Sequence, residues 1–245
     1  MSAARDFHRA WHDLPLADLD DITGTGTCLI LAPHPDDESL GCGGLIARCV
    51  AAGRAPLVVV LTDGAGSHPN SRAYPPDRLR AVRASEVRTA IGHLGLKPNR
   101  LVLLGEPDTA APHEGPGFED IVARLANLVT MEAECTAILA PWLHDPHCDH
   151  RAASLAAAAV AGITGCRHVA YPVWGWTLPA ACSIPGSPTA GWRLDIGAFR
   201  SAKQAAVQAH RSQYDDLITD DPTGFRLPRD LLAAFDSGWE TFIEP

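Results

Sequence analysis

Two short segments of the chain hold most of the side chains that could carry out chemistry. The first, residues 33–38, has the sequence Pro-His-Pro-Asp-Asp-Glu and packs one imidazole and three carboxylates into six residues. Because neighbouring carboxylates repel one another, such a segment is tolerated when a cation or hydrogen-bond donors neutralise it. The second segment, residues 141–150, contains three histidines and two aspartates: His144, Asp145, His147, Asp149 and His150. The two segments together indicate a metal site.

The residue types favour a catalytic metal site over a structural one. A catalytic zinc ion keeps an open position beside three protein ligands, whereas a structural zinc ion is closed by four. A tight loop could aim His34 and Asp37 at one ion, and His150 could complete the set from the second segment. We therefore expect these three residues to be the metal ligands.

Further residues of the two segments are predicted to take part in catalysis without binding the metal. Asp36 is left free, and an uncoordinated carboxylate beside a metal can remove a proton from an attacking water. His147 precedes His150 by three residues, which would bring its ring near the open position as a hydrogen-bond donor to a developing oxyanion. Asp149 or Asp145 could orient that ring. We expect Asp36, His147 and Asp149 to be catalytic.

The same residues also have a purely structural interpretation. Aspartate and histidine at strand ends are often helix caps or solvated loop residues, and Asp36 or Ser39 could cap the following helix. For one segment alone the two interpretations are about equally supported. The presence of two such segments, each in the type of loop where ligands bind, favours the metal site.

The elements that must position these residues follow a regular alternation. Short apolar runs, which predict strands, alternate with longer segments in which apolar residues recur at helical spacing. The predicted strands are 27–32, 56–62, 100–104, 136–140 and 168–173, and the predicted helices are 39–52, 77–95, 118–133 and 149–162. This pattern is typical of an α/β fold with a mostly parallel central sheet. Ligands bind at the carboxyl ends of such strands, so the two segments meet if the first and fourth strands are neighbours.

The remainder of the chain is less regular. Residues 174–196 are rich in Pro, Gly and Trp, which indicates a structured loop, and a helix is expected over 199–213. We divide the chain into an N-terminal arm, 1–26, a single domain, 27–213, and a C-terminal tail, 214–245. The tail carries widely spaced apolar residues and is expected to pack on the domain or on a neighbouring subunit of a homo-oligomer.

Composition excludes several classes of partner. With 29 acidic and 20 basic residues the formal charge is −9, which disfavours nucleic acid and anionic membrane surfaces as partners. No apolar stretch reaches the roughly 18 residues of a membrane span. The N-terminus lacks the basic-then-apolar order of a secretory signal, and the seven cysteines show no CxxC pair. We therefore expect a cytoplasmic protein with reduced thiols.

The two segments also carry a family resemblance. Residues 31–38, Leu-Ala-Pro-His-Pro-Asp-Asp-Glu, resemble the (A/P)HPDDE signature of the PIG-L or LmbE-like zinc-dependent N-deacetylases, and residues 147–150, His-Cys-Asp-His, resemble the HPDH motif of that family. The resemblance implies a Rossmann-like three-layer sandwich. It implies removal of an N-acetyl group from an amino sugar of N-acetylglucosamine type, usually within a conjugate, with release of acetate and a free amine. It also implies Zn²⁺ as cofactor, with Fe²⁺ or another divalent ion left open.

Carried over residue by residue, the resemblance assigns the same roles to the two segments. His34, Asp37 and His150 match the metal ligands of the family, Asp36 matches the general base, and His147 matches the residue that stabilises the oxyanion.

Weaker matches lie elsewhere in the chain. Arg83 and Glu86 resemble an RxxE pair whose arginine contacts substrate, although an exposed ion pair within one helix is equally expected. Asp108 resembles an aspartate that binds a substrate hydroxyl. Residues 210–213 are similar to a late His-x-x-Gln element of open role. Cys148 replaces the usual proline of the second motif, and a bystander thiol is expected there.

Other interpretations of the same sequence are weighed against this one. His34-Pro35-Asp36 with His150 would also give the HxD…H triad of a non-haem Fe(II) oxygenase, but those sites usually sit in β folds. A carbohydrate-binding protein without activity would not need both Asp36 and His147. The glycines of residues 41–44 do not complete a dinucleotide fingerprint. Trp174 and Trp176 could stack on a sugar ring, but packing is favoured.

Overall fold

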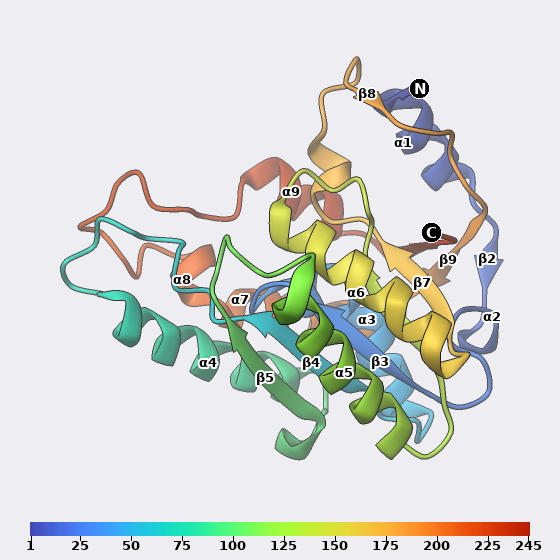
Figure 1. The fold of residues 1–245 in the computed structure, drawn as a ribbon. Coiled ribbons are helices and arrows are strands. Elements are labelled where there is room, and N and C mark those ends of the chain that lie inside the picture. Colours follow the sequence, from blue (N-terminus) through green and yellow to red (C-terminus); the bar gives the residue numbers. More distant parts are fainter.

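The computed structural model describes residues 1–245 and places an eight-stranded mixed sheet between two layers of helices (Figure 1). The strand order is β2-β9-β10-β7-β6-β3-β4-β5. Strands of the sheet are β2 (Leu16–Ala17), β3 (Thr27–Ala32), β4 (Leu57–Thr62), β5 (Leu101–Glu106), β6 (Cys135–Pro141), β7 (Arg167–Tyr171), β9 (Gly191–Asp195) and β10 (Trp239–Ile243). The five strands from β7 to β5 are mutually parallel. The predicted α/β class with a mostly parallel sheet is confirmed.

Helices cover both faces of the sheet because alternate side chains of each strand point to opposite sides. The helices are α1 (Ala4–Asp13), α2 (Leu19–Thr23), α3 (Asp37–Ala51), α4 (Pro76–His93), α5 (Gly115–Met131), α6 (Cys148–Thr164), α7 (Arg200–Ala209), α8 (Arg211–Tyr214) and α9 (Arg229–Phe235). In β3, Ile30 packs in the cluster that includes α3, α4 and α7, whereas Leu29 and Leu31 pack against α5 and α6. The result is the expected three-layer sandwich.

The edge of the sheet beyond β7 was not expected in this form. Residues 174–196, predicted as a structured loop, contain the 3₁₀ turn Trp174–Thr177, the short strand β8 (Ser183–Ile184), which pairs with β1 (Ser2–Ala3), and β9. The tail supplies β10, which runs antiparallel between β9 and β7. A strand was hard to see in the sequence there because β10 buries Glu240 and Thr241. The domain boundaries at residues 26 and 213 remain a prediction.

The helix predicted over 199–213 is divided at His210, where the backbone leaves helical geometry (φ −79°, ψ 59°) between α7 and α8. His210 is fully buried and its Nε2 lies 3.0 Å from Glu38 Oε1, so the break turns this side chain towards the first segment.

The N-terminal arm packs through an aromatic cluster. Phe7 and Trp11 of α1 contact Trp142 after β6, with ring centroids 5.2 and 5.0 Å apart, and Trp11 lies 4.9 Å from Trp176. Trp176 therefore has the packing role that the sequence favoured. None of the helices is both long and apolar enough to cross a membrane.

Candidate active site

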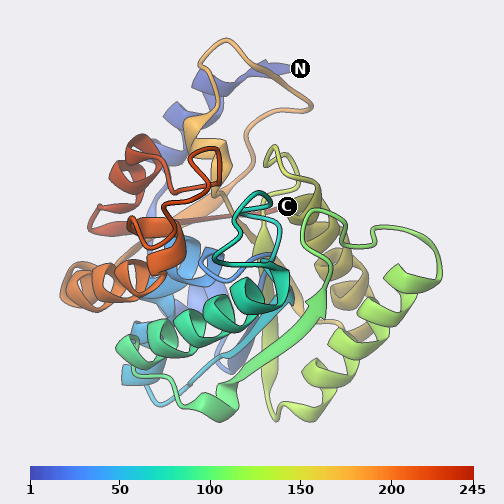
Figure 2. The ribbon, with the colours of Figure 1, turned by 90° about the vertical axis from the view of Figure 1, so that its left-hand side faces the viewer.

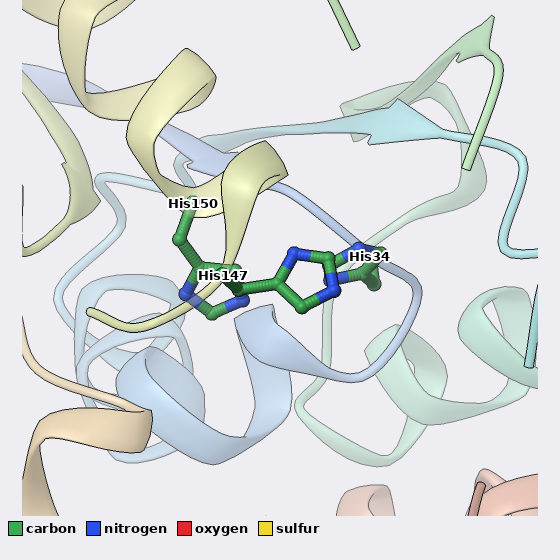
Figure 3. A group of neighbouring side chains, drawn as sticks. All are labelled: His34, His147 and His150. Atoms are coloured by element: carbon green, nitrogen blue, oxygen red, sulfur yellow. The ribbon is translucent and has the colours of Figure 1, made fainter. Parts of the chain in front are cut away.

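The two predicted segments meet at the carboxyl ends of two central strands of the sheet. β3 and β6 are neighbouring parallel strands, so the loops that follow them leave the sheet side by side. The first loop carries His34 and leads into α3 at Asp37, and the second carries His147 and leads into α6, which contains His150. Figure 3 shows the imidazole rings of His34, from the first loop, and of His147 and His150, from the start of α6, close together. Their ligand atoms lie within 4.8 Å of one another.

Two of the predicted metal ligands, His34 and His150, lie close to one carboxylate oxygen of the third, Asp37. Asp37 Oδ2 lies 3.1 Å from His34 Nδ1 and 3.3 Å from His150 Nε2. His150 Nε2 is buried and has no hydrogen-bond partner, although Asp37 is so close. Two imidazole nitrogens and one carboxylate oxygen form the donor set of a catalytic zinc site. These residues therefore fit a divalent cation, and the orphaned nitrogen of His150 is the observation that favours one.

The charges of these three groups shift one another's pKa values. Burial by itself raises the pKa of Asp37, but the imidazoles of His150 and His34 outweigh it and hold the pKa well below its usual value. Burial lowers the pKa of His150, yet the carboxylates of Asp37 and Asp145 raise it to about 9. Burial also lowers the pKa of His34. Three neighbouring carboxylates outweigh burial and raise this pKa well above its usual value. A histidine nitrogen must be deprotonated to bind a cation, so protons and a metal would compete for these residues.

Asp145 fixes the orientation of His150. Its Oδ2 accepts a hydrogen bond from His150 Nδ1 at 3.0 Å, which leaves Nε2 facing Asp37. The same carboxylate accepts backbone N–H groups of Val173, Trp174 and Gly175 at 2.7–3.2 Å. The sequence suggested Asp145 as an orienter of His147. In the structure Asp145 instead orients His150, which lies three residues further along the chain.

The carboxylate of Asp149 contacts His34 and not the ring of His147. Its Oδ2 lies 3.1 Å from His34 Nε2 and accepts the Thr109 N–H at 2.7 Å, while Oδ1 accepts the Ala111 N–H at 3.0 Å. The side chain is fully buried and does not line the pocket that is bordered by His34, Asp36, Asp37 and His147. Burial raises the pKa of Asp149, but the hydrogen bonds from His34 and the backbone lower it overall.

His147 is held in one tautomer. Its Nδ1 accepts the backbone N–H of Asp149 at 3.2 Å, so in the neutral ring the proton lies on Nε2. Burial and the neighbouring imidazoles of His34 and His150 lower the pKa of His147, which favours this neutral form. The ring lines the pocket beside His34, with centroids 4.6 Å apart. His147 can therefore donate a hydrogen bond from Nε2.

Asp36 lies in the pocket with its backbone in a conformation that favours glycine (φ 150°). Its side chain makes no cap hydrogen bond to α3, so the helix-cap interpretation does not explain it. Such strain persists when the surrounding structure holds the residue in place. Arg83 does so, since Nη2 donates to Asp36 Oδ2 at 3.0 Å and to the carbonyl of Pro35 at 2.7 Å. Burial raises the pKa of Asp36 to about 6, against the opposing charge of Arg83.

Arg83 and Glu86 do not form the exposed helical ion pair that was weighed for them. Both are buried, and Arg83 lines the pocket. Glu86 instead accepts hydrogen bonds from the backbone N–H and the hydroxyl of Ser212, each at 2.7 Å. The RxxE spacing therefore joins the active-site loop to the late His-x-x-Gln element.

Asp108 also lines the pocket. Its Oδ1 lies 3.3 Å from His34 Nε2, and its Oδ2 accepts the Gly66 N–H at 2.8 Å. Burial raises the pKa of Asp108, but the hydrogen bond and charge of His34 lower it to about 2. Cys148 is exposed, and its thiol contacts the Thr109 carbonyl at 3.3 Å.

Several lining residues were not singled out from the sequence. These residues line the cavity of about 170 Å³ at the predicted site. Ser67 and Gly66 come from the loop after β4, and Phe225 and Leu227 come from the tail. Trp174, for which packing was favoured, contributes its half-buried ring to the cavity wall. The tail gave no local signal for this position, because its contact with the site depends on the course of the chain after α8.

Comparisons with known proteins agree with this fold and site. The model of the PIG-L family, described as GlcNAc-PI de-N-acetylase, matches residues 29–161. A 1D-myo-inositol 2-acetamido-2-deoxy-alpha-D-glucopyranoside deacetylase of Saccharomonospora viridis is 29% identical over 239 residues, covering 81% of this chain and 88% of the relative. A diacetylchitobiose deacetylase of Thermococcus kodakarensis is 26% identical over 199 residues, covering 77% and 70%. The crystal structure of a conserved Thermus thermophilus protein superposes with a TM-score of 0.63 at 27% identity, covering 90% and 95%.

The fold and site define an N-deacetylase of the LmbE/PIG-L type. The family match extends over more than half of the chain and includes both segments of the site. The chain belongs to the PIG-L family.

Proposed function

We propose that this protein is a zinc-dependent hydrolase that removes the acetyl group from an N-acetylated amino sugar within a sugar conjugate. The observation that carries the proposal is the placement of Asp36 and the Nε2–H of His147 in one cavity, which His34 and Asp37 also line. Two of the relatives named above, those of Saccharomonospora viridis and Thermococcus kodakarensis, are named as deacetylases of sugars of this chemical class, which supports the choice of substrate.

We assign His34, Asp37 and His150 as metal ligands. When bound, the cation would supply Lewis-acid polarisation of the acetyl carbonyl and of the attacking water. Asp145 and Asp149 would act as positioning residues, because each fixes the ring of one of these histidines. Asp149, expected to be catalytic, would thus act through His34.

The remaining steps are assigned to residues of the cavity. Asp36 takes a proton from the attacking water at Oδ1, the oxygen that Arg83 leaves free. His147 donates a hydrogen bond from Nε2 to the carbonyl oxygen as negative charge develops there. Asp36 then returns its proton to the nitrogen as the C–N bond breaks, and acetate and a free amine leave. Arg83 and Asp108 line the same cavity and would contact the hydroxyl groups of the sugar.

The oxygenase alternative is not favoured. Its histidine and aspartate would be His34 and Asp36, but Asp36 is bound to Arg83, and Asp37 is the carboxylate between the two histidines. A binding protein without activity would have no use for a strained base beside a neutral histidine donor.

Acetate release tests the proposal. Protein loaded with Zn²⁺ is incubated with a panel of N-acetylglucosamine conjugates, and acetate and free amine are measured with and without a chelator. We expect equimolar products that disappear with the chelator and fall at least 100-fold in Asp36→Asn. Undiminished turnover in Asp36→Asn would contradict the role of the base, and the Asp236→Asn variant at an exposed ion pair serves as the matched control.

A further inference from the structure

A second cavity, of about 320 Å³, lies where the tail strand β10 separates from β7. The two strands pair only at Ile243 and Ala170. Residues beyond this pair line what we call the β10 cavity: Pro172, Trp239, Glu240 and Thr241. Its other walls come from α1, the turn Trp174–Thr177 and α9, which Figure 2 shows on one side of the molecule. Sites for small molecules typically have volumes of roughly 300–1,000 Å³. The β10 cavity is therefore large enough to hold a small ligand.

The β10 cavity is separate from the candidate active site. No residue lines both cavities. Trp174 lines the active-site cavity, whereas Trp176, two residues later in the same turn, lines the β10 cavity. None of the steps assigned to acetamide hydrolysis uses a residue of the β10 cavity. A substrate bound in the active site therefore does not explain the lining of the β10 cavity.

Arg193 of β9 brings a positive charge without a counter-charge to the β10 cavity. Its Nε donates to the Leu14 carbonyl at 2.7 Å, but its Nη1 and Nη2 groups make no hydrogen bond or ion pair with the protein. The guanidinium carbon lies 5.6 Å from the centre of the Trp239 ring, within the range of a cation–π contact. Arg193 is thus held in place while its Nη groups stay available. A guanidinium presented in this way favours a carboxylate, which can accept two parallel N–H groups.

Glu240 does not supply the missing counter-charge. It is the only carboxylate of the lining. Its Oε1 accepts the Gly44 N–H and Lys203 Nζ, and its Oε2 accepts the Leu45 N–H, all at 2.7 Å. The other titratable side chains of the lining, His8 and His12, add no negative charge. The β10 cavity therefore favours an anion over a cation.

Aromatic rings form the apolar walls of the β10 cavity. Trp176 packs edge-to-face on Trp11, with centroids 4.9 Å apart and an angle of 68° between the rings. Trp176 and Phe235 are half-buried, and Trp239 is 41% exposed, so each ring keeps free surface. Aromatic surfaces of this kind pack well against a planar ring of a ligand. The walls therefore favour an aromatic body next to the anionic group.

We propose that the β10 cavity is a binding site for a small aromatic carboxylate, separate from the site of acetamide hydrolysis. The carboxylate accepts hydrogen bonds from the Nη groups of Arg193, and the ring packs against Trp176 and Trp239. This inference is independent of the proposed function, because it uses none of the catalytic residues.

Calorimetry of the full-length, Zn²⁺-loaded protein with phenylacetate tests the site. Two matched probes keep the phenyl ring and the two-carbon chain: 2-phenylethanol is neutral and 2-phenylethylamine is cationic. We expect one phenylacetate per chain with a Kd of about 1 mM or tighter, and a Kd at least about tenfold weaker for the alcohol and for the amine. N-acetylglucosamine should leave the phenylacetate Kd unchanged, because the two cavities share no residue. No saturable binding up to about 10 mM, equal Kd values for the three probes, or displacement by N-acetylglucosamine would overturn the inference.

Variants locate the bound probe. Arg193→Met keeps the apolar stem and removes the charge, so phenylacetate should bind at least about tenfold more weakly while 2-phenylethanol is unaffected. Trp239→Leu changes an exposed side chain and should weaken both probes about two- to fivefold. Arg124→Met is the matched control, because Arg124 also donates to a main-chain carbonyl, that of Leu104, but lies near β5 at the opposite edge of the sheet.

A phenylacetate Kd in Arg193→Met equal to that of wild type would overturn the inference, because the probe would then be held elsewhere, for example at the zinc ion. If Arg193→Met does not fold, an equal Kd in Trp239→Leu has the same meaning. An equal loss of affinity in Arg124→Met and Arg193→Met would also overturn it, since the effect would then not belong to the β10 cavity.

Discussion

Replacing Asp145 by asparagine should weaken metal binding without touching a predicted ligand. The carboxylate accepts four hydrogen bonds, from His150 Nδ1 and from the backbone N–H groups of Val173, Trp174 and Gly175. An asparagine side chain has only one acceptor oxygen, so either orientation turns its NH₂ group towards at least one of these donors. The negative charge that makes His150 more basic is also lost.

The magnitude follows from these contacts. Loss of a carboxylate that orients a ligating histidine typically costs about 10- to 100-fold in metal affinity. In the metal-free protein, at least one buried N–H loses its partner, which costs about 1–3 kcal/mol of the free energy of unfolding. Both effects are expected because Asp145 is buried and water cannot easily replace it.

Competition with a chromogenic chelator measures the Zn²⁺ affinity, and urea unfolding of the metal-free protein measures stability. Asp236→Asn is the matched control, because Asp236 pairs with Arg200 at the surface. A Zn²⁺ Kd for Asp145→Asn within twofold of the wild-type value would refute the reasoning.

Three further predictions concern the surroundings of the site. Arg83→Met should lower kcat/KM for acetate release at least tenfold, because buried Asp36 loses its ion pair; an unchanged value would contradict this. Gly41→Ala should lower the free energy of unfolding by about 1–3 kcal/mol, because the new Cβ would lie 2.3 Å from the ring of Tyr171. A melting temperature equal to that of wild type would show that the ring can move. Burial lowers the pKa of His210, but the neighbouring carboxylate of Glu38 has the larger effect, and the net pKa lies above the usual value. The pair of His210 and Glu38 therefore stabilises the fold fully below about pH 6.5, the usual pKa of histidine, and less as the pH rises through the raised pKa. Urea unfolding of the metal-free protein should therefore show the largest difference between wild type and His210→Gln at low pH, and a difference that grows with pH would contradict the assignment.

The parallel part of the sheet could be predicted from local sequence. The strand expected at residues 27–32 coincides with β3, because its residues are all apolar or β-branched and the five after Thr27 are buried between two helical layers. The strand β10 could not be predicted in this way. Its Glu240 accepts hydrogen bonds from the backbone of Gly44 and Leu45 and from Lys203 Nζ, so a polar residue occupies the core. Only the tertiary partners of Glu240 explain why it is buried there.

The candidate site also combines residues whose placement could be predicted from the sequence with contacts that could not be. His34, Asp37 and His150 could be placed together only on the condition that the strands before them are neighbours, and the structure meets that condition by pairing β3 with β6. The partners of Asp145 and Asp149 depend on which face of α6 and of the preceding turn meets the first loop. Phe225 is more than 100 residues from Ser67 in the chain, and the hydrogen bonds that join their loops are long-range contacts without a local pattern.

Acetate release by the metal-loaded protein tests the central claim most directly. The account predicts one divalent ion per chain, chelator-sensitive release of acetate and free amine from an N-acetylglucosamine conjugate, and at least a 100-fold loss of turnover in Asp36→Asn with the metal still bound. Metal-loaded protein that releases no acetate from any conjugate, or an Asp36→Asn variant as active as wild type, would contradict it.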